Sequence, residues 1–309
     1  MIPPCGIGTR SVSIYNAATM DHQAEQEPSL DRMVLGIAGV GLIGGSIAAA
    51  ARARMVCSRI IGFGRSAERL RTAQRAGLID DFSTDYELCR DVDFFVSCLP
   101  VDRIAESVRA AGARMSPGSV LTDAGSTKRG LCEGIGVSPS PGTTFVGSHP
   151  LAGSERQGFE HADANLFDGR VCVITPSGAE SPEAVTRVAE FWAKLGSRVV
   201  SLSAAEHDKI LARTSHTPHI AAAALASIAR GDDLPLAAGG FRDTTRIAAG
   251  DPALWTSILL ANRAAVEATL DLFLRQCEMF REALQDDDAN RLQALLADAK
   301  SRRDAFDDL

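Results

Sequence analysis

The stretch Gly39-Val40-Gly41-Leu42-Ile43-Gly44-Gly45-Ser46 decides the fold of the N-terminal half of this chain. It follows an apolar run at 34–38, which is typical of a buried strand, and it opens a segment rich in Ile and Ala, which is typical of a helix. In a Gly-x-Gly-x-x-Gly turn the first glycine permits the tight turn. The second lets a pyrophosphate approach the backbone, and the third lets the helix pack against the strand. This strand–helix context disfavours a glycine-rich turn without a ligand, so we predict as cofactor-binding residues Gly39, Gly41, Leu42, Ile43 and Gly44.

Short apolar runs continue to alternate with helical stretches as far as residue 202. The predicted strands are 34–38, 59–63, 93–99, 119–122, 144–147, 171–175 and 198–202. These runs are too continuously apolar for a sheet with one solvated face. We therefore predict a Rossmann domain over residues 33–202, with a doubly wound, mostly parallel sheet that helices cover on both faces. Residues 1–32 have no sustained periodicity and are expected to form a disordered leader.

The pattern becomes helical at Ser203, which forms a capping box with Glu206 and starts a predicted helix that runs toward Arg230. Further helices are predicted at roughly 252–285 and 287–306, where apolar residues recur at three- and four-residue spacing. We predict an all-α domain over residues 203–309. Because this half is short and rich in Ala and Leu, we expect it to pack against a second copy, which would make the protein a homodimer.

Composition excludes several classes of function. The 309 residues are 45% hydrophobic, enough for about two domains, and a net charge of −7 argues against nucleic-acid and anionic-membrane partners. The seven cysteines show no C-x-x-C and no paired Cys/His spacing, which favours reduced thiols and no metal site. The apolar stretch 255–274 is interrupted by polar and charged residues, so it is not a membrane span. With no secretory segment, we expect a cytoplasmic protein that acts on a small molecule.

The end of the second predicted strand indicates which dinucleotide is preferred. An acidic residue about 20 residues beyond the last glycine would bind the ribose 2′-hydroxyl of NAD. Here that position is Gly64, followed by Arg65 and Ser66. A guanidinium and a hydroxyl suit a 2′-phosphate, so we predict NADP over NAD, with Arg65 and Ser66 as cofactor-binding residues. The alternative is that Arg65 is a solvated residue at the start of a helix.

Three motifs carry a resemblance to a known family. They are Gly147-Ser148-His149-Pro150-Leu151-Ala152-Gly153-Ser154-Glu155, the Asp-x-x-Ser-x-Lys pattern at 123–128, and Ser215-His216-Thr217-Pro218-His219. Together they closely resemble the prephenate/arogenate dehydrogenase family. The resemblance implies an NAD(P)-dependent oxidoreductase that converts prephenate to 4-hydroxyphenylpyruvate by oxidative decarboxylation, in tyrosine biosynthesis. The leader and the Gly64-Arg65 pair, which replaces an acidic residue, depart from the family pattern.

Two residues are predicted to be catalytic. His149 follows a strand and precedes a proline that restrains its backbone, and it is expected to be the general base. A lone histidine is more often structural, and it is the surrounding motif that favours catalysis. Ser126 follows a strand at the sheet edge where ligands bind, so it should either hold the tautomer of His149 or contact the nicotinamide side. Lys128 is a cation at the start of a predicted helix; the alternative is a surface charge, and it is not predicted to be catalytic.

The resemblance also implies a set of substrate-binding residues in the second half, together with Glu155, a gate or a helix cap. Pro218 should kink its helix between His216 and His219, whose spacing gives only weak support for zinc. We expect His219 to donate to the acidic side chain of the substrate, whereas the role of His216 is less defined. In the constellation at 239–262 the predicted residues are Arg246 as a bidentate clamp for a carboxylate, Asp243 as its orienting partner, and Trp255 as either core or site.

Several alternatives remain open at this level. Arogenate carries an amino group where prephenate has its side-chain keto group, and 4-amino-4-deoxyprephenate carries a ring amine in place of the hydroxyl. His219 favours prephenate. A β-hydroxyacid dehydrogenase-like reductase would share the domain plan but needs a catalytic lysine in the helical half, where only Lys209 is a candidate. An NADP-sensing binding protein would keep the glycine turn without the His and Arg residues.

Overall fold

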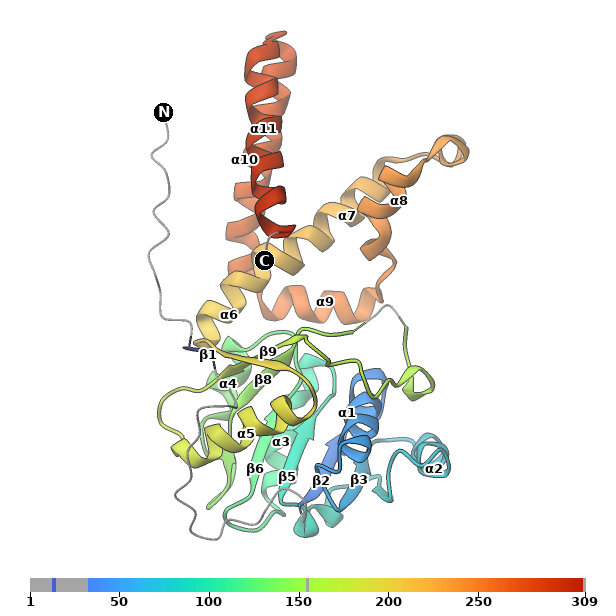
Figure 1. Cartoon of the computed structure of the whole chain (residues 1–309), viewed down its shortest axis with the longest axis vertical. Coiled ribbons are helices and arrows are strands. Elements are labelled where there is room, and N and C mark those ends of the chain that lie inside the picture. Colours follow the sequence, from blue (N-terminus) through green and yellow to red (C-terminus); the bar gives the residue numbers. More distant parts are fainter. Residues whose placement is uncertain (1–12, 15–32, 154–155, 308–309) are drawn as a thin grey trace.

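The computed structural model describes residues 13–14, 33–153 and 156–307 of the chain. Figure 1 shows an α/β part at the bottom and a helical part that stands above it, with helix α9 (Pro252–Ala261) lying across the junction. None of the helices in these described ranges combines the length and apolar character that a membrane crossing requires.

The main sheet has six parallel strands and confirms the predicted Rossmann architecture. Its spatial order is β4 (Asp81–Ser83), β3 (Arg59–Phe63), β2 (Val34–Ala38), β5 (Phe94–Ser97), β6 (Val120–Asp123) and β7 (Thr144–Phe145). If β2 is numbered 1, this is the order 3-2-1-4-5-6 of a doubly wound sheet. The chain adds strands in one direction from β2 to β4 and in the opposite direction from β5 onward. Strand β4 was not predicted, because Asp81-Phe82-Ser83 is short and only half-buried.

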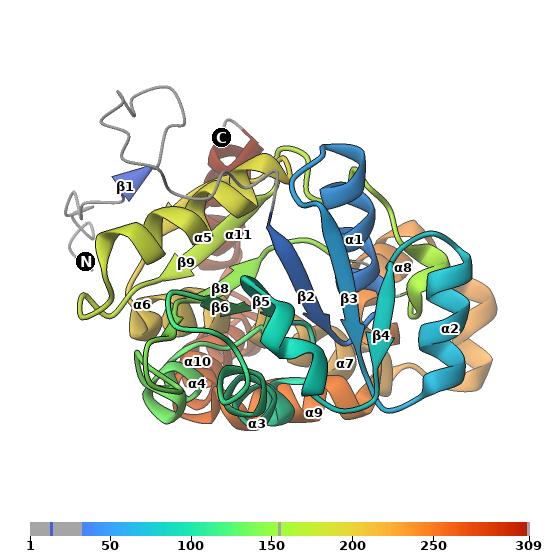
Figure 2. The same cartoon turned by 90° about the horizontal axis from the view of Figure 1, so that it is seen from below.

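Helices cover both faces of this sheet (Figure 2). Helices α1 (Leu42–Ala53) and α5 (Pro182–Lys194) lie on one face, and α3 (Val101–Gly112) and α4 (Arg129–Ile135) lie on the other. Helix α2 (Ala67–Arg75) packs beside β4. Successive side chains of a strand point to opposite faces, so Phe94 joins the core under α1 and α5, whereas Phe95 joins the core under α3. Both cores are apolar, as the continuous apolar runs predicted.

The last strands form a second sheet, and here the prediction of one parallel sheet was incomplete. The order is β1 (Ser13–Ile14), β10 (Arg198–Ser201), β9 (Val171–Thr175) and β8 (Gly147–Pro150). Only β9 and β10 run parallel, whereas β1 and β8 are antiparallel to their neighbours. The predicted strand 144–147 is split at Val146, where the chain leaves the first sheet for the second. Residues Ser13–Ile14, which fall within the predicted leader, form strand β1 and pair with β10.

The second half is helical, as predicted. The elements are α6 (Ala204–Leu211), a π-helical turn η4 (Ala212–His216), α7 (Thr217–Ile228), η5 (Gly231–Leu236), α8 (Gly239–Thr245), η6 (Arg246–Ala249), α9, α10 (Arg263–Gln285) and α11 (Ala289–Asp307). Ser203 caps α6 by accepting a hydrogen bond from the backbone N–H of Glu206. Figure 1 shows α10 and α11 side by side.

Two predicted helices differ in detail from the observed ones. The helix that Ser203 caps passes through the π-helical turn η4 just before Pro218, which lacks an N–H. Such turns are rare, and many of those known lie at functional sites. The predicted helix 252–285 is two helices, α9 and α10, which meet at Asn262. The side-chain amide of Asn262 donates a hydrogen bond to the backbone oxygen of Asp208, and this contact holds the break in place.

Candidate active site

The glycine turn between β2 and α1 has the shape that a dinucleotide requires. Gly39 has a φ of +87°, and a Cβ there would lie 2.8 Å from the backbone oxygen of Cys98. A Cβ at Gly44 would lie 2.2 Å from the backbone oxygen of Gly39. At Gly41, by contrast, a Cβ would meet nothing within 4 Å. The space beside the second glycine is therefore open at the position where a pyrophosphate approaches such a turn.

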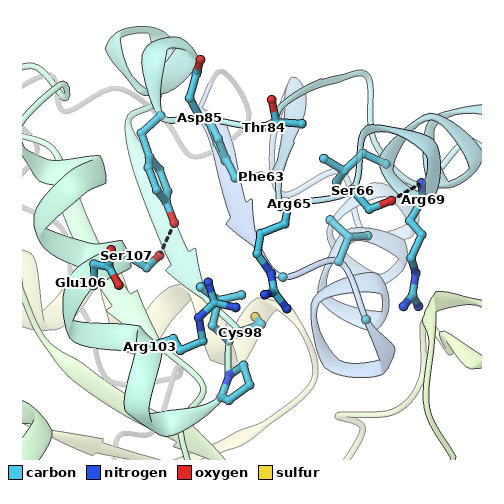
Figure 3. A pocket seen from close by; sticks show the side chains of 18 residues that line it. Phe63, Arg65, Ser66, Arg69, Thr84, Asp85, Cys98, Arg103, Glu106 and Ser107 are labelled. Carbon is cyan, nitrogen blue, oxygen red and sulfur yellow. Dashed lines mark hydrogen bonds between the residues drawn. The ribbon is translucent and has the colours of Figure 1, made fainter.

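A cavity of about 710 Å³ opens from this turn toward the ends of β3 and β4 (Figure 3). Arg65, from the loop after β3, and Arg103, from α3, both reach into it. In the described part of the chain neither guanidinium is in an ion pair. Ser66 also lines the cavity, and its hydroxyl caps α2 by accepting the backbone N–H of Arg69 at 3.3 Å. Arg69 lines the cavity as well, so three cations line the space next to Gly64.

Two carboxylates, those of Asp85 and Glu106, also line this cavity and oppose the arginines. The side chain of Ser83 donates a hydrogen bond to Asp85 at 2.7 Å. This hydrogen bond, followed by that of the Glu87 N–H, lowers the pKa of Asp85. Beside it the Tyr86 hydroxyl donates to Ser107 at 2.9 Å, which fixes the wall of the cavity.

A second cavity of about 760 Å³ shares Gly39 and Gly41 with the first and extends to His149. It brings together the predicted cofactor residues Leu42, Ile43 and Gly44 with the two predicted catalytic residues, His149 and Ser126. The start of α9 closes its other side through Asp251, Leu254 and Ser257. The space therefore lies between the two domains, where a dinucleotide and a second small molecule would meet.

His149 is held by a residue that the sequence did not predict. Its Nδ1 lies 2.9 Å from Nε2 of His207, and Nδ1 of His207 lies 2.8 Å from Oδ1 of Asp208. The three side chains are buried. No hydrogen bond joins Ser126 to His149 among the described residues, so the partner of the imidazole is His207 and not Ser126. The sequence signal is Glu206-His207-Asp208, of which the sequence pattern predicts only the capping role of the glutamate.

Asp208 ties this group to the Rossmann domain. Its two carboxylate oxygens accept the backbone N–H groups of Lys128, at 2.8 Å, and Arg129, at 2.9 Å, where α4 begins. Lys128 itself is fully buried and forms an ion pair with Asp123, which rules out the alternative of a surface charge. Asp123 also accepts the backbone N–H groups of Gly125 and Ser148, which precedes His149.

Burial keeps the two paired histidines neutral. It lowers the pKa of His149 well below 6.5, and the charge of Lys128 and any charge that His207 or His216 acquires on protonation lower it further. Burial also lowers the pKa of His207, although the hydrogen bond to Asp208 opposes this effect. For Asp208, burial acts to raise the pKa, but the hydrogen bonds that it accepts outweigh burial and hold the pKa below 3.8. At neutral pH the group is thus one carboxylate and two uncharged imidazoles.

His216, His219 and Trp255, three of the predicted substrate residues, form a cluster. His216 is buried, its Nδ1 lies 3.1 Å from the amide nitrogen of Asn262, and burial lowers its pKa to about 4. His219 is stacked on Trp255, and its Nδ1 is buried without a hydrogen-bond partner. None of the three is among the residues that line the cavity beside His149. Asn262 connects the cluster to the backbone of Asp208.

The remaining predicted site residues lie elsewhere. Arg246 in η6 and Asp243 in α8 are exposed in the single chain and outside the cavity lining. The described residues include no ion pair between them, so the structure does not show Asp243 orienting Arg246. Glu155 lies outside the described residues. Nearby, the side chain of Gln157 donates to Asp251 at 3.1 Å and links the loop after β8 to the start of α9.

No group of three or more His, Cys, Asp or Glu side chains is placed to hold a metal ion in the described ranges. A dinucleotide, in contrast, fits the residues that are present. The open space at Gly41 suits the pyrophosphate, and the two adjoining cavities suit the two nucleotide halves. The arginines beside Gly64 suit the negative charge of the dinucleotide.

Comparison with known proteins agrees with this geometry. Residues 47–201 match the prephenate dehydrogenase nucleotide-binding domain, and residues 203–298 match the prephenate dehydrogenase dimerization domain. The chain is 33% identical to the prephenate dehydrogenase of Bacillus subtilis over 280 residues, which cover 87% of this chain and 75% of that protein.

Two solved structures are similar along almost their whole length. One is prephenate dehydrogenase from A. aeolicus in complex with hydroxyphenyl propionate and NAD+, with a TM-score of 0.82, 29% identity, and coverage of 90% of this chain and 99% of that one. The other is Synechocystis arogenate dehydrogenase, with a TM-score of 0.77, 29% identity, and coverage of 89% and 100%. The chain therefore belongs to the prephenate dehydrogenase family and is an NAD(P)-dependent oxidoreductase of the prephenate/arogenate type.

Proposed function

We propose that the protein oxidises and decarboxylates prephenate to 4-hydroxyphenylpyruvate, a step toward tyrosine, with NADP as the electron acceptor. The observation that carries the proposal is the cavity between the domains, which places the neutral imidazole of His149 within the same space as the glycine turn. An uncharged, buried histidine at this position can accept a proton from a substrate hydroxyl.

The chemistry needs one proton acceptor from the protein. Bound nicotinamide supplies the acceptor for the hydride that leaves C4 of the substrate ring. His149 takes the proton of the 4-hydroxyl, and the electrons of that O–H bond form a carbonyl. The electrons of the bond to the ring carboxylate then move into the ring, CO2 leaves, and the oxygen recovers a proton as the ring becomes aromatic. Ser126 lines the same cavity and is proposed to contact the nicotinamide side.

The two anionic groups of the substrate need cationic or hydrogen-bonding partners. We assign these roles to Arg246, which has no ion pair in the described ranges, and to His219, whose Nδ1 is buried and unpartnered. Arg246 lies in η6, which precedes α9, and His219 lies in α7 and stacks on Trp255 of α9. Trp255, His216, Asp243 and Glu155 complete the proposed substrate site. Holding both ends of the substrate orients its C4 for reaction, and such orientation supplies much of the rate.

The preference for NADP rests on the first cavity. Arg65 and Arg103 present two guanidinium groups beside the end of β3, where Gly64 takes the place of the carboxylate that would repel a 2′-phosphate. We also propose that the protein acts as a homodimer. Several large apolar side chains are exposed on the helical domain of the single chain: Leu225, Ile228, Leu272, Phe273, Leu274 and Leu296.

The test offers the purified protein prephenate, arogenate and 4-amino-4-deoxyprephenate in parallel, each with NADP and with NAD, and follows reduction by near-ultraviolet absorbance. Fastest turnover of prephenate with NADP is expected. A clear preference for either amine-bearing substrate would overturn the substrate assignment, and a preference for NAD would overturn the cofactor assignment.

The role of His149 is tested by one substitution. His149→Asn should lower kcat by roughly 10²–10⁴-fold, because a positioned general base contributes about that much. His161→Gln replaces an exposed histidine outside the cavity and serves as the matched control, with unchanged rate. An unchanged rate in His149→Asn would refute the assignment.

A further inference from the structure

We propose that His207 and Asp208 are positioning residues that fix the tautomer of His149, with its proton on Nδ1 and its lone pair on Nε2. The inference deepens the proposed function, because it explains which nitrogen of His149 acts as the base. It rests on the buried chain of contacts from Asp208 through His207 to His149.

The proton positions follow from counting donors, beginning at Asp208. A backbone N–H can only donate, so the contacts from Lys128 N and Arg129 N require both oxygens of Asp208 to accept. Oδ1 receives Lys128 N and also lies 2.8 Å from Nδ1 of His207. An ionised carboxylate has no proton to give, so the hydrogen in this second contact belongs to Nδ1 of His207.

The next contact then has only one solution. A neutral imidazole that carries its proton on Nδ1 has a lone pair on Nε2. The proton between His207 and His149, 2.9 Å apart, must therefore come from Nδ1 of His149. Nε2 of His149 is left unprotonated and able to accept the substrate's proton. A doubly protonated His207 would reverse this order, but it would bury a second cation close to Lys128 without access to water.

The surroundings hold this arrangement rigidly. The amide nitrogen of Asn262 donates to the backbone oxygen of Asp208 at 2.8 Å, and the start of α4 holds its carboxylate. The charged and titratable groups acting on His149 are His207, Lys128 and His216, and all three disfavour a positive charge on it. When His149 becomes an imidazolium during turnover, its Nδ1–H already donates to His207, and Asp208 lies behind His207. The chain thus stabilises the transient charge that Lys128 opposes.

The experiment reads the tautomer directly. The full-length protein is labelled with 15N-histidine, and NMR identifies which ring nitrogen of His149 carries the proton, with His149→Asn and His161→Gln used for assignment. In the wild type we expect a proton on Nδ1 and none on Nε2. His207→Gln keeps an acceptor for His149 and a donor for Asp208, so it should retain this tautomer and turnover within about tenfold.

His207→Leu removes both groups, so the Nε2–H tautomer of His149 should appear. Turnover should then fall by about 10²-fold or more with KM little changed, because a wrong tautomer disables a general base. A proton on Nε2 in the wild type would overturn the inference, as would an unaltered tautomer in His207→Leu. If His207→Leu does not fold, the wild-type and His207→Gln spectra still decide the question.

These spectra need no substrate, so the two proposals fail separately. A proton on Nε2 of His149 would refute the role of His207 and Asp208, whatever reaction the enzyme performs. If His149 has the expected tautomer but the protein does not oxidise prephenate, only the proposed function is refuted.

Discussion

The imidazole of His219 lies flat on the indole of Trp255, with ring centroids 3.5 Å apart and planes inclined by 12°. The backbone of Gly250 is packed against this pair, because a Cβ there would lie 2.5 Å from Nε1 of Trp255 and 3.1 Å from Cε1 of His219. Gly250 has ordinary backbone angles, φ −62° and ψ 155°, so only this contact, and not its conformation, requires glycine.

We therefore expect Gly250→Ala to push the two rings apart. Its free energy of unfolding should fall by about 1–3 kcal/mol, the usual cost of overpacking, and KM for the substrate should rise. Gly239→Ala is the matched control, because a Cβ at that helical position meets nothing within 4 Å and alanine favours helix. Chemical denaturation of the two variants makes the comparison. Equal stability of both would show that the stacked pair tolerates displacement.

Acidification should destabilise the protein from near pH 7 downward. Burial lowers the pKa of His149, His207 and His216 below 6.5, and that of His216 to about 4. Between these lowered values and about 6.5 the unfolded chain binds protons that the folded chain does not bind. The free energy of unfolding therefore rises with pH through this window. The stability that the neutral histidines contribute is lost as the pH falls through the same window.

Calorimetry between pH 5 and pH 8 measures this effect. We expect Tm to drop steadily below pH 7 and to be nearly flat above it. His216→Gln removes one of the three groups and should make the dependence shallower, whereas His161→Gln, at an exposed position, should leave it unchanged. A Tm that is the same at pH 5 and pH 7.5 would contradict the neutral state of the buried histidines.

The choice of cofactor should depend on residue 64. A Cβ at Gly64 would meet only side-chain atoms of Leu70, at 3.7 Å or more, so Gly64→Asp fits without strain. Its carboxylate would repel a 2′-phosphate and accept a hydrogen bond from a ribose 2′-hydroxyl. We expect the ratio of kcat/KM for NADP to that for NAD to fall by about 10–100-fold, the value of one or two charge-assisted contacts.

Gly64→Ala adds the Cβ without the charge and should leave the ratio close to that of the wild type. Arg65→Ala should lower the ratio through NADP alone, with little change for NAD. A ratio that is insensitive to both Gly64→Asp and Arg65→Ala would place cofactor selection at another residue.

The buried pair of Lys128 and Asp123 should matter more for stability than a surface ion pair. Lys128→Met leaves the Asp123 carboxylate buried with only two backbone N–H donors, from Gly125 and Ser148. We expect the free energy of unfolding to fall by about 3–5 kcal/mol. The double variant Lys128→Met with Asp123→Asn should be less damaged than the sum of the two single variants, as a double-mutant cycle would measure. Additive losses would mean that the pair is not coupled.

The sequence predicted the parts of the fold that local pattern controls. The apolar run predicts β2, and the three glycines predict the turn and the start of α1. Each of these signals depends only on neighbouring residues, because each glycine meets a steric requirement of the turn itself. The second sheet could not be predicted in the same way. The run at 171–175 has the same composition as the strands of the first sheet, and only the departure of the chain at Val146 decides which neighbours β9 receives.

The site residues show the same difference between local signals and long-range packing. His149 and Ser126 were found through motifs, and the structure places both at one cavity. His207 and Asp208 were missed because a His-Asp pair in the first half of a helix has the same pattern whether it faces solvent or a second domain. Burial of Lys128 was missed for the same reason: its partner Asp123 is five residues away, yet the space that encloses the pair is built by distant segments.

The hydrogen bonds from Lys128 and Arg129 to Asp208 cross from one domain to the other, so both domains contribute to holding His149, the proposed catalytic base. The nucleotide-binding half contains His149, but among its described residues none forms a hydrogen bond with the imidazole ring, whose partner is His207 of the helical half. Under the proposed mechanism, oxidation depends on the correct assembly of the two domains. A partly folded protein, or one whose helical half has swung away, could still load its coenzyme but would be a poor oxidant of whatever metabolite entered the open cleft.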